Sequence, residues 1–443
     1  MKEYKIKTLN EMGHNLPVDE IIAQLNLIDS QTNQAVYIRF DEVPYNFSPT
    51  DLEQIIRNLP KRCRGIDLGS LVRIDSSVTI SDFEKICQFL PQDLIKLDAK
   101  RILGGIPTAA LIERFLKALP AAREVNLKGN SLHLMNNKAF TLLKDGDILD
   151  LRANSWQLSW RESNFLFLKN IAKTYRALYV DLPTSLPEGD DYKLMCAAFF
   201  KKIPNYVHTL GLSIFGLDEL SISELFNSFP ATVHTIKWFN HDQLPFEKFF
   251  AATPKPVHTL DLSNWHLGRC QHYIVGKQFT YLPKHVHTLD LSNNELNHWS
   301  LGNLCDMLGN IPETVTQINL QANALFANKT ALEVSTFLNN LPVERTVWLK
   351  DNFLFSKKNL SEREQLIEKI GSFLTKGHLV LDEDLVTPVI PLTQAMKQEL
   401  ITEDACNRII FYLGAQTNTF FHNQGKKFTP LYQRPNEAVK PAT

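Results

Sequence analysis

Four histidines occupy one recurring position in this chain, and their type and spacing could do chemistry. Each follows a valine in a seven-residue phrase, which reads V-H-T-L-G-L-S, V-H-T-I-K-W-F and, twice, V-H-T-L-D-L-S; the histidines are His208, His234, His258 and His287. If consecutive phrases form neighbouring strands, equivalent side chains lie about 4.8 Å apart. Clustered imidazoles could then bind a metal ion or titrate near neutral pH. Because no carboxylate or cysteine shares this position, we expect a packing or hydrogen-bonding role and no metal site.

Cysteine is the other residue type that could carry chemistry. The six cysteines are scattered and form no C-x-x-C or metal-ligand spacing, which favours a reducing compartment. Cys305 precedes Asp306, and Cys406 lies close to Glu403 and Asp404. Acidic neighbours raise the pKa of a thiol and so oppose a nucleophilic role. The sequence also has no glycine-rich phosphate loop and no Ser/His/Asp signature. We therefore predict a protein without catalytic activity and without a cofactor.

The histidine phrase belongs to a longer repeat. Pairs of apolar residues separated by one residue recur at thirteen places, about 28 residues apart on average. Alternation of apolar residues is the period of a β-strand. We place Lys96 between Ile95 and Leu97, and Asp181 between Val180 and Leu182, in the same row of side chains as Asp67 and the other central residues of the pairs.

The clearest units have the form L-x-L-x-x-N-x-L, as in residues 289–296. The asparagines should hydrogen-bond neighbouring turns as a ladder; they are Asn130, Asn154, Asn294, Asn323 and Asn352. Between strands, apolar residues three and four apart predict a helix, as in residues 304–308, and a proline then ends it. Two steps of 24 residues, ending at Leu151 and Leu262, leave less room for a helix.

These patterns predict an α/β fold, a leucine-rich-repeat solenoid with about 13 repeats. We expect a horseshoe with parallel strands on the concave face and helices on the convex face. The solenoid should span residues 31–385, with an N-terminal helical cap over 1–30 whose helix covers 18–27. A C-terminal helical cap over 386–422 and a flexible tail over 423–443 should follow.

Composition excludes several classes of partner. The formal net charge is −1, so no overall field draws the chain to nucleic acid or to an anionic membrane. There is no run of about eighteen or more apolar residues, so we expect no integral membrane segment. Residues 1–7 lack the apolar core of a secretory signal peptide. A protein partner is the remaining expectation, bound by a monomer.

The phrase P-x-x-V-H-T-L-D-L-S-x-N-x-L at residues 283–296 resembles the repeat of leucine-rich-repeat effectors of Legionella and related intracellular bacteria, with ribonuclease-inhibitor-like repeats. The resemblance covers roughly residues 35–385. It implies a virulence protein that a type IV system delivers, without a signal peptide, into the host cell cytoplasm. There it would bind a host protein, and the stretch after Asn423 would suit a secretion signal.

Two alternatives involve a host ubiquitin pathway. Some bacterial leucine-rich-repeat effectors are ubiquitin ligases with a separate catalytic domain, but the roughly 60 residues after Leu381 are too few for that domain. Residues 16–22 resemble the opening of an F-box, yet residues 36–40 already have a strand pattern. An adaptor or ligase component acting through an unrecognised terminal module remains the alternative function.

The partner should bind the concave face. Side chains between the apolar pairs point there, and aromatic residues and arginine are the most frequent interface hot spots. Phe239, Trp348, Arg152 and Tyr179 are therefore the leading candidates. The complete predicted set is Arg39, Lys96, Lys128, Arg152, Tyr179, Lys237, Phe239, Asp261, Asp290, Trp348 and Lys350.

Overall fold

The computed structural model consists of two compact units, residues 1–258 and residues 259–443. It describes residues 1–9, 15–32, 34–40, 47–75, 77–135, 137–154, 162–181, 197–213, 226–239, 250–342, 344–354, 365–366 and 379–380. The C-terminal cap over 386–422 and the tail over 423–443, both expected from the sequence, lie outside the described residues and stay predictions.

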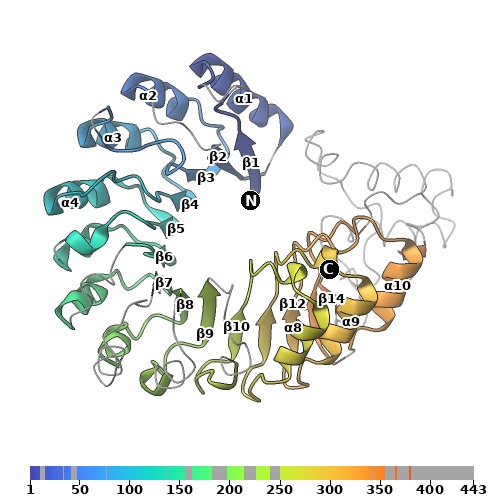
Figure 1. Cartoon of the computed structure of the whole chain (residues 1–443). Helices are drawn as coiled ribbons and strands as arrows, with labels where there is room; N and C mark the ends of the chain where they lie inside the picture. The colour runs from blue at the N-terminus through green and yellow to red at the C-terminus, as the bar shows by residue number, and fades with distance from the viewer. Residues whose placement is uncertain are drawn as a thin grey trace, which may run out of the picture. The chain divides into compact units, whose positions relative to one another are not determined.

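In the first unit every strand pairs in parallel with the next strand in the chain. Within this unit the strands line the inner side of an arc, and the helices lie outside them (Figure 1). The strands are β1 (Lys2–Ile6), β2 (Val36–Phe40), β3 (Cys63–Asp67), β4 (Leu94–Asp98), β5 (Ala122–Asn126), β6 (Ile148–Asp150), β7 (Ala177–Asp181), β8 (Thr209–Ser213) and β9 (Thr235–Phe239).

The second unit repeats this parallel arrangement, and each of its strands pairs with the next. Its strands are β10 (Thr259–Asp261), β11 (Thr288–Asp290), β12 (Gln317–Asn319), β13 (Thr346–Trp348) and β14 (Leu379–Val380). A strand is present at each of the thirteen predicted places, from β2 to β14. The chain therefore folds as an α/β leucine-rich-repeat solenoid.

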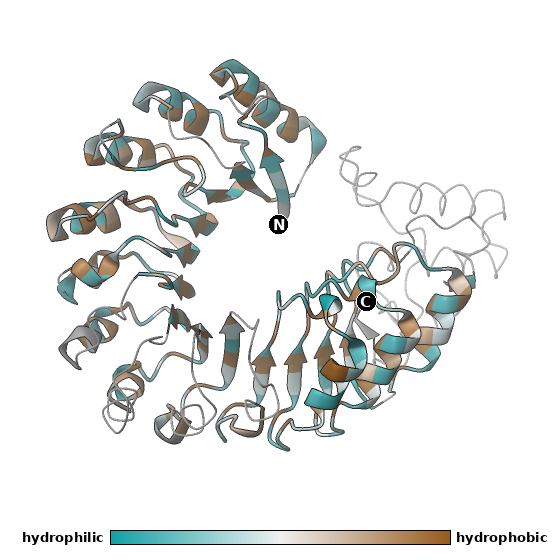
Figure 2. Cartoon of the chain, in the orientation of Figure 1, coloured by the Kyte–Doolittle hydropathy of each residue, from teal (hydrophilic) through white to brown (hydrophobic). Residues whose placement is uncertain are grey.

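Each α-helix turns one apolar face toward the strands. In α2, Leu52, Ile55 and Ile56 are buried, and Figure 2 shows the same division into apolar and polar sides on the other helices. Capping boxes start α2, α3 and α10, where a serine or threonine and an acidic residue three positions later satisfy free backbone N–H groups. The α-helices are α1 (Val18–Gln31), α2 (Pro49–Arg57), α3 (Ile80–Cys87), α4 (Ala109–Ala118), α8 (His272–Phe279), α9 (Leu301–Gly309) and α10 (Ala331–Asn339).

Short repeats have tighter connections. The predicted shortage of room before Leu151 is confirmed, because 3-10 helices replace the α-helix between β5 and β6. In the corresponding step before Leu262, residues 240–249 lie outside the described residues. The 3-10 helices are η1 (Leu132–Leu134), η2 (Asn137–Leu142), η4 (Glu162–Asn170), η5 (Phe226–Ser228), η6 (Leu267–Arg269) and η7 (Leu296–His298).

The asparagine ladder is confirmed in both units. Asn323 is buried, and its Oδ1 accepts the backbone N–H of Asn294 at 2.7 Å. Its Nδ2 donates to the carbonyl oxygens of Leu291 and Leu320, both at 2.9 Å. Asn154 serves Asn130 in the same way at 2.8 Å. The residues on both sides of Asn323, Ala322 and Ala324, adopt the left-handed conformation, at φ of 55° and 53°. These hydrogen bonds hold a turn that non-glycine residues otherwise disfavour.

Three features differ from the sequence prediction. The N-terminal segment contains the predicted helix as α1, but also the strand β1, which pairs with β2. The register predicted for β4 and for β7 was wrong by two residues. Asp98, not Lys96, lies beside Asp67, and Tyr179, not Asp181, lies beside Gly211. The apolar pairs are therefore Leu97/Ala99 and Leu178/Val180, on the same faces as predicted.

Candidate functional site

The open side of the strands brings some of the predicted partner-binding residues together and leaves others apart. Arg39 lies near the N-terminus, 3.5 Å from Glu3. The Lys96 ammonium lies 4.9 Å from the centre of the Tyr37 ring. Arg39 on β2 and Lys96 on β4 lie apart from the cluster formed by Arg152, Tyr179, Lys237 and Phe239, which begins after β6. We name that cluster the β6–β9 patch.

In the β6–β9 patch, two aromatic rings and two basic side chains contact one another. The rings of Tyr179 and Phe239 meet edge to face, with centroids 5.3 Å apart. The Arg152 guanidinium carbon lies 3.4 Å from the Phe239 centroid, and the Lys237 ammonium nitrogen 5.6 Å. These are the geometries of aromatic pairing and cation–π attraction. All four residues are partly exposed, so the patch is accessible to a partner.

Gly211 on β8 makes this arrangement possible. It lies in register between Tyr179 on β7 and Lys237 on β9. A Cβ at position 211 would overlap the Tyr179 ring and would lie 2.7 Å from Cε2 of Phe239. Glycine therefore lets the two rings meet over the middle strand. The sequence placed Gly211 on this face but gave no sign of its role.

Two carboxylates lie beside the patch. Asp150 accepts hydrogen bonds from Nε and Nη2 of Arg152, the latter at 2.6 Å, and so fixes the guanidinium. Asp181 is buried and accepts the backbone N–H of Ala153. Burial raises the pKa of Asp181, while its hydrogen bonds to Ala153 and Ser213 oppose that shift. Both carboxylates thus support the patch from within.

Lys128 stands next to the patch. It is half-buried, and its pKa is lowered mainly by burial and then by the positive charge of Arg152, with Arg101 adding to the effect. Among the described residues, neither Lys128 nor Arg101 has an ion-pair partner within 4.0 Å. Three basic side chains therefore lie on successive repeats, and only Arg152 has its own carboxylate.

An ion cluster on β3 and β4 has a structural role that the sequence did not suggest. The Lys100 ammonium lies 3.0 Å from Asp67 and 3.4 Å from Asp98. Asp67 is fully buried, and Ser70 donates its hydroxyl and its backbone N–H to it. Burial, followed by the charge of Asp67, raises the pKa of Asp98. A buried charge held this way serves the turn rather than a ligand.

In the second unit the predicted acidic residues have local partners. Asp261 accepts the backbone N–H of Ser263 at 2.9 Å, and Asp290 accepts that of Ser292 at 2.8 Å. Trp348 is partly exposed, in the same row as Asp290. Lys350 follows two residues later, just after β13, and is also partly exposed. Partner binding by these residues remains a prediction.

The histidines form a stacked ladder in the first unit. The rings of His208 and His234 are 6.0 Å apart and nearly parallel, and those of His234 and His258 are 5.1 Å apart. Nδ1 of His208 lies 3.1 Å from the carbonyl oxygen of Thr232, in the turn before the next strand. His234 contacts Pro256 O, and His287 contacts Thr314 O, in the same way. These contacts support the hydrogen-bonding interpretation. In the described part of the chain, no three metal-ligating side chains lie close enough to hold an ion.

Three of the described cysteines have a thiol pKa above its usual value, which opposes a nucleophilic role. Burial raises the pKa of Cys63 and of Cys87 to about 12. Burial and then the charge of Asp306 raise the pKa of Cys305, which lies in α9 as expected. Cys406 lies outside the described residues.

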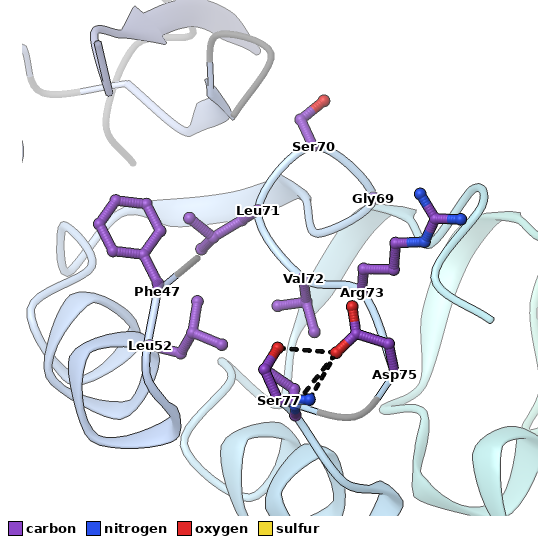
Figure 3. A pocket seen from close by; sticks show the side chains of 10 residues that line it. Phe47, Leu52, Gly69, Ser70, Leu71, Val72, Arg73, Asp75 and Ser77 are labelled. Atoms are coloured by element: carbon purple, nitrogen blue, oxygen red, sulfur yellow. Dashed lines mark hydrogen bonds between the residues drawn. The ribbon is translucent and has the colours of Figure 1, made fainter. Parts of the chain in front are cut away.

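A hollow beside β3 is too small for a ligand. Residues of the loop that follows β3, with Phe47 and Leu52, line a space of about 20 Å³ (Figure 3). That volume holds about one water molecule. The polar side chain in its wall already has a partner, since Asp75 accepts hydrogen bonds from the backbone N–H and the hydroxyl of Ser77.

In the described residues, no helix is both long and apolar enough to cross a bilayer.

No protein-family model and no curated protein matches the sequence. Among solved structures, the leucine-rich repeat-containing protein LegL7 of Legionella pneumophila is 18% identical, with a TM-score of 0.44, and the match covers 70% of this chain and 89% of that chain. TLR13 in a TLR13–ssRNA13 complex is 14% identical with a TM-score of 0.33; the match covers 79% of this chain and 48% of TLR13. Likeness at this level carries no argument about function. By its own repeats, parallel strands and asparagine ladder, the chain is a leucine-rich-repeat protein.

Proposed function

We propose that the chain is a non-catalytic binding protein that engages a host protein through the β6–β9 patch. The observation that carries the proposal is the contact of Arg152 and Tyr179 with Phe239 on the open side of the strands. Arginine and tyrosine are enriched among the residues that dominate binding energy. Because these side chains already contact one another, they lose less conformational entropy when a partner binds.

The biological setting is also part of the proposal. The repeat phrase at residues 283–296 resembles that of leucine-rich-repeat effectors of Legionella-type bacteria. We infer that a type IV system delivers the chain into the host cell cytoplasm, where it acts as a monomer. Trp348, Asp261, Asp290 and Lys350 provide a second candidate surface in the other unit.

An affinity pull-down from eukaryotic cell lysate tests the binding site. The wild type is compared with Phe239→Ala and with Leu332→Ala, which removes an apolar side chain that is 76% exposed on α10. A protein retained by the wild type and Leu332→Ala, but lost with Phe239→Ala, supports the proposal. With the purified partner, Phe239→Ala should weaken Kd roughly thirtyfold, the effect of about 2 kcal/mol at a hot spot.

Two other outcomes argue against the β6–β9 patch. A partner that both variants retain equally lies elsewhere, and Trp348→Ala then tests the second unit. A lysate that yields no specific partner contradicts the binding function itself. Each variant is first checked by circular dichroism, so that loss of binding is not loss of fold.

Delivery needs a separate experiment. The chain is fused to a reporter enzyme that is active only in eukaryotic cytoplasm and is expressed in bacteria with and without a functional type IV system. Reporter activity that requires the secretion system supports the effector role. Activity in neither strain refutes that role without affecting the binding proposal.

A further inference from the structure

We propose that the partner presents an acidic segment to this surface, with a carboxylate bound at Lys128 and a neighbouring apolar side chain against Phe239 and Tyr179. This inference rests on the proposed function and specifies its partner. It follows from three observations: a basic site in which Lys128 and Arg101 lack an ion-pair partner within 4.0 Å in the described part of the chain, its position next to the aromatic rings, and the arrangement of nearby acidic residues.

The basic site consists of Lys128, Arg101 and Arg152 on three consecutive repeats. Strands β4, β5 and β6 pair in register, and each of these residues follows one of them. The backbone N–H of Arg101 donates to the carbonyl oxygen of Lys128, so the two residues are adjacent. Burial and then the charge of Arg152 lower the pKa of Lys128 and so disfavour its charged form, and the charges of Asp150 and Asp181 oppose this shift only in part. A bound carboxylate would offset both effects.

Nearby acidic side chains already serve internal partners. Asp150 is occupied by Arg152, at 2.6 and 2.9 Å. Asp181 is buried and accepts the N–H of Ala153. On the preceding repeats, Asp67 and Asp98 share Lys100. These carboxylates therefore have partners of their own beside Lys128 and Arg101, and the remaining carboxylate on this face of β5, Glu124, lies four residues before Lys128.

The apolar part of the site lies on the same side of the same strands. Arg152 connects the basic and the apolar part of the site. It follows β6, which pairs with β5, the strand before Lys128. Its guanidinium packs on the Phe239 ring. Lys237 on β9 adds a second positive charge, 5.6 Å from the centroid of that ring. A peptide lying across these strands would meet one positive charge just after β6 and another on β9, with Tyr179 on β7 between them. This order matches an apolar residue flanked by acidic residues.

Synthetic peptides test this order of charges. The probe is a blocked, fluorescently labelled heptapeptide, G-E-E-F-E-E-G. One comparison peptide has lysine in place of glutamate, and another has glycine in place of phenylalanine. Binding to the full chain is measured by fluorescence anisotropy at low salt. We expect binding of the acidic aromatic peptide, weaker binding of the peptide without phenylalanine, and none of the basic peptide.

Variants place the effect at Lys128. Lys128→Glu should weaken binding of the acidic aromatic peptide at least roughly tenfold. Lys117→Glu makes the same charge change at an exposed position on α4 and should leave binding unchanged. Lys128→Gln removes the charge without reversing it, so it provides an intermediate loss should Lys128→Glu fail to fold. Added salt should weaken the wild-type interaction as it screens the charges.

The outcomes separate this inference from the proposed function. Equal binding of the basic peptide, no binding of the acidic aromatic peptide, or an unchanged affinity in both Lys128 variants overturns the acidic-segment inference. The proposed function survives any of these results if the pull-down still identifies a partner that depends on Phe239. Conversely, peptide binding that Phe239→Ala does not weaken would refute the aromatic half of the site.

Discussion

Replacing Asn323 with alanine should destabilise the second unit far more than an ordinary asparagine substitution. Asn323 is 1% exposed, so water cannot replace its hydrogen bonds. Its loss leaves the backbone N–H of Asn294 and the carbonyl oxygen of Leu291 without the partners that they have at 2.7 and 2.9 Å. A buried group left unpaired costs roughly 1–3 kcal/mol. Two such groups predict a loss of about 2–6 kcal/mol in the free energy of unfolding.

Urea unfolding with hydrogen exchange measures this effect. The control is Asn339→Ala, at an exposed position near the end of α10, which should change the free energy of unfolding by about 0.5 kcal/mol or less. Because a solenoid repeat depends chiefly on its neighbours, the amide of Asn294 should lose protection while β1 and β2 keep theirs. A urea midpoint no lower than that of the control, or an unchanged exchange rate at Asn294, would refute the role assigned to the ladder.

Three further predictions concern single contacts. Gly211→Ala should separate the rings over β8 and reduce partner binding as much as Phe239→Ala does, with an unchanged circular dichroism spectrum; full binding would contradict the packing argument. Arg345→Met removes two hydrogen bonds to carbonyl oxygens at the end of α9. It should lower the free energy of unfolding, measured by urea titration, by about 1–3 kcal/mol. No change would show that these bonds are dispensable. Hydrogen bonds from Arg269 and His266 lower the pKa of Glu295 to about 2. The stabilising effect of the ionised carboxylate is therefore complete above about pH 4.5 and is lost as pH falls through 2. An NMR titration should show the lowered pKa of Glu295, and Arg269→Gln should raise it.

The repeat sequence was enough to predict the fold because three signals agreed. Apolar alternation gave the strands, asparagine after the second apolar residue gave the turn, and apolar residues three and four apart gave the helices. Where the asparagine is present, as at Asn130 and Asn294, the register was correct. Both residues are buried and bonded as the pattern requires.

In β4 and β7, where that asparagine is missing, alternation gave the face of the strand but not its register. Ile102 occupies the asparagine position after β4, and Pro183 occupies it after β7. Alternation is equally satisfied after a shift of two residues, which keeps every side chain on its side. In β4 the second buried apolar residue is the small Ala99, whereas the sequence prediction paired Leu97 with the larger Ile95. This is why Lys96 and Asp181 were assigned to the wrong row.

The β6–β9 patch illustrates what residue type predicts and what it does not. Arg152, Tyr179 and Phe239 were chosen because arginine and aromatic residues are frequent hot spots, and Lys237 because it faces the concave side. The structure brings these four together. Arg39 and Lys96 were chosen on the same grounds and lie elsewhere. Contact between side chains on nonadjacent strands depends on the small residue between them, and a single sequence does not reveal that geometry.

The asparagine ladder also gives the solenoid a direction. Each Oδ1 accepts backbone N–H groups of the preceding repeat, as Asn352 does for Asn323 and Asn323 does for Asn294. A repeat is therefore completed by the sequence that follows it. During synthesis from the N-terminus, the newest turn would stay incompletely bonded until the next asparagine leaves the ribosome. Removing repeats from the C-terminal end should likewise leave the last remaining turn without the asparagine oxygen that accepts its N–H groups. Removing repeats from the N-terminal end should leave every remaining turn with that acceptor.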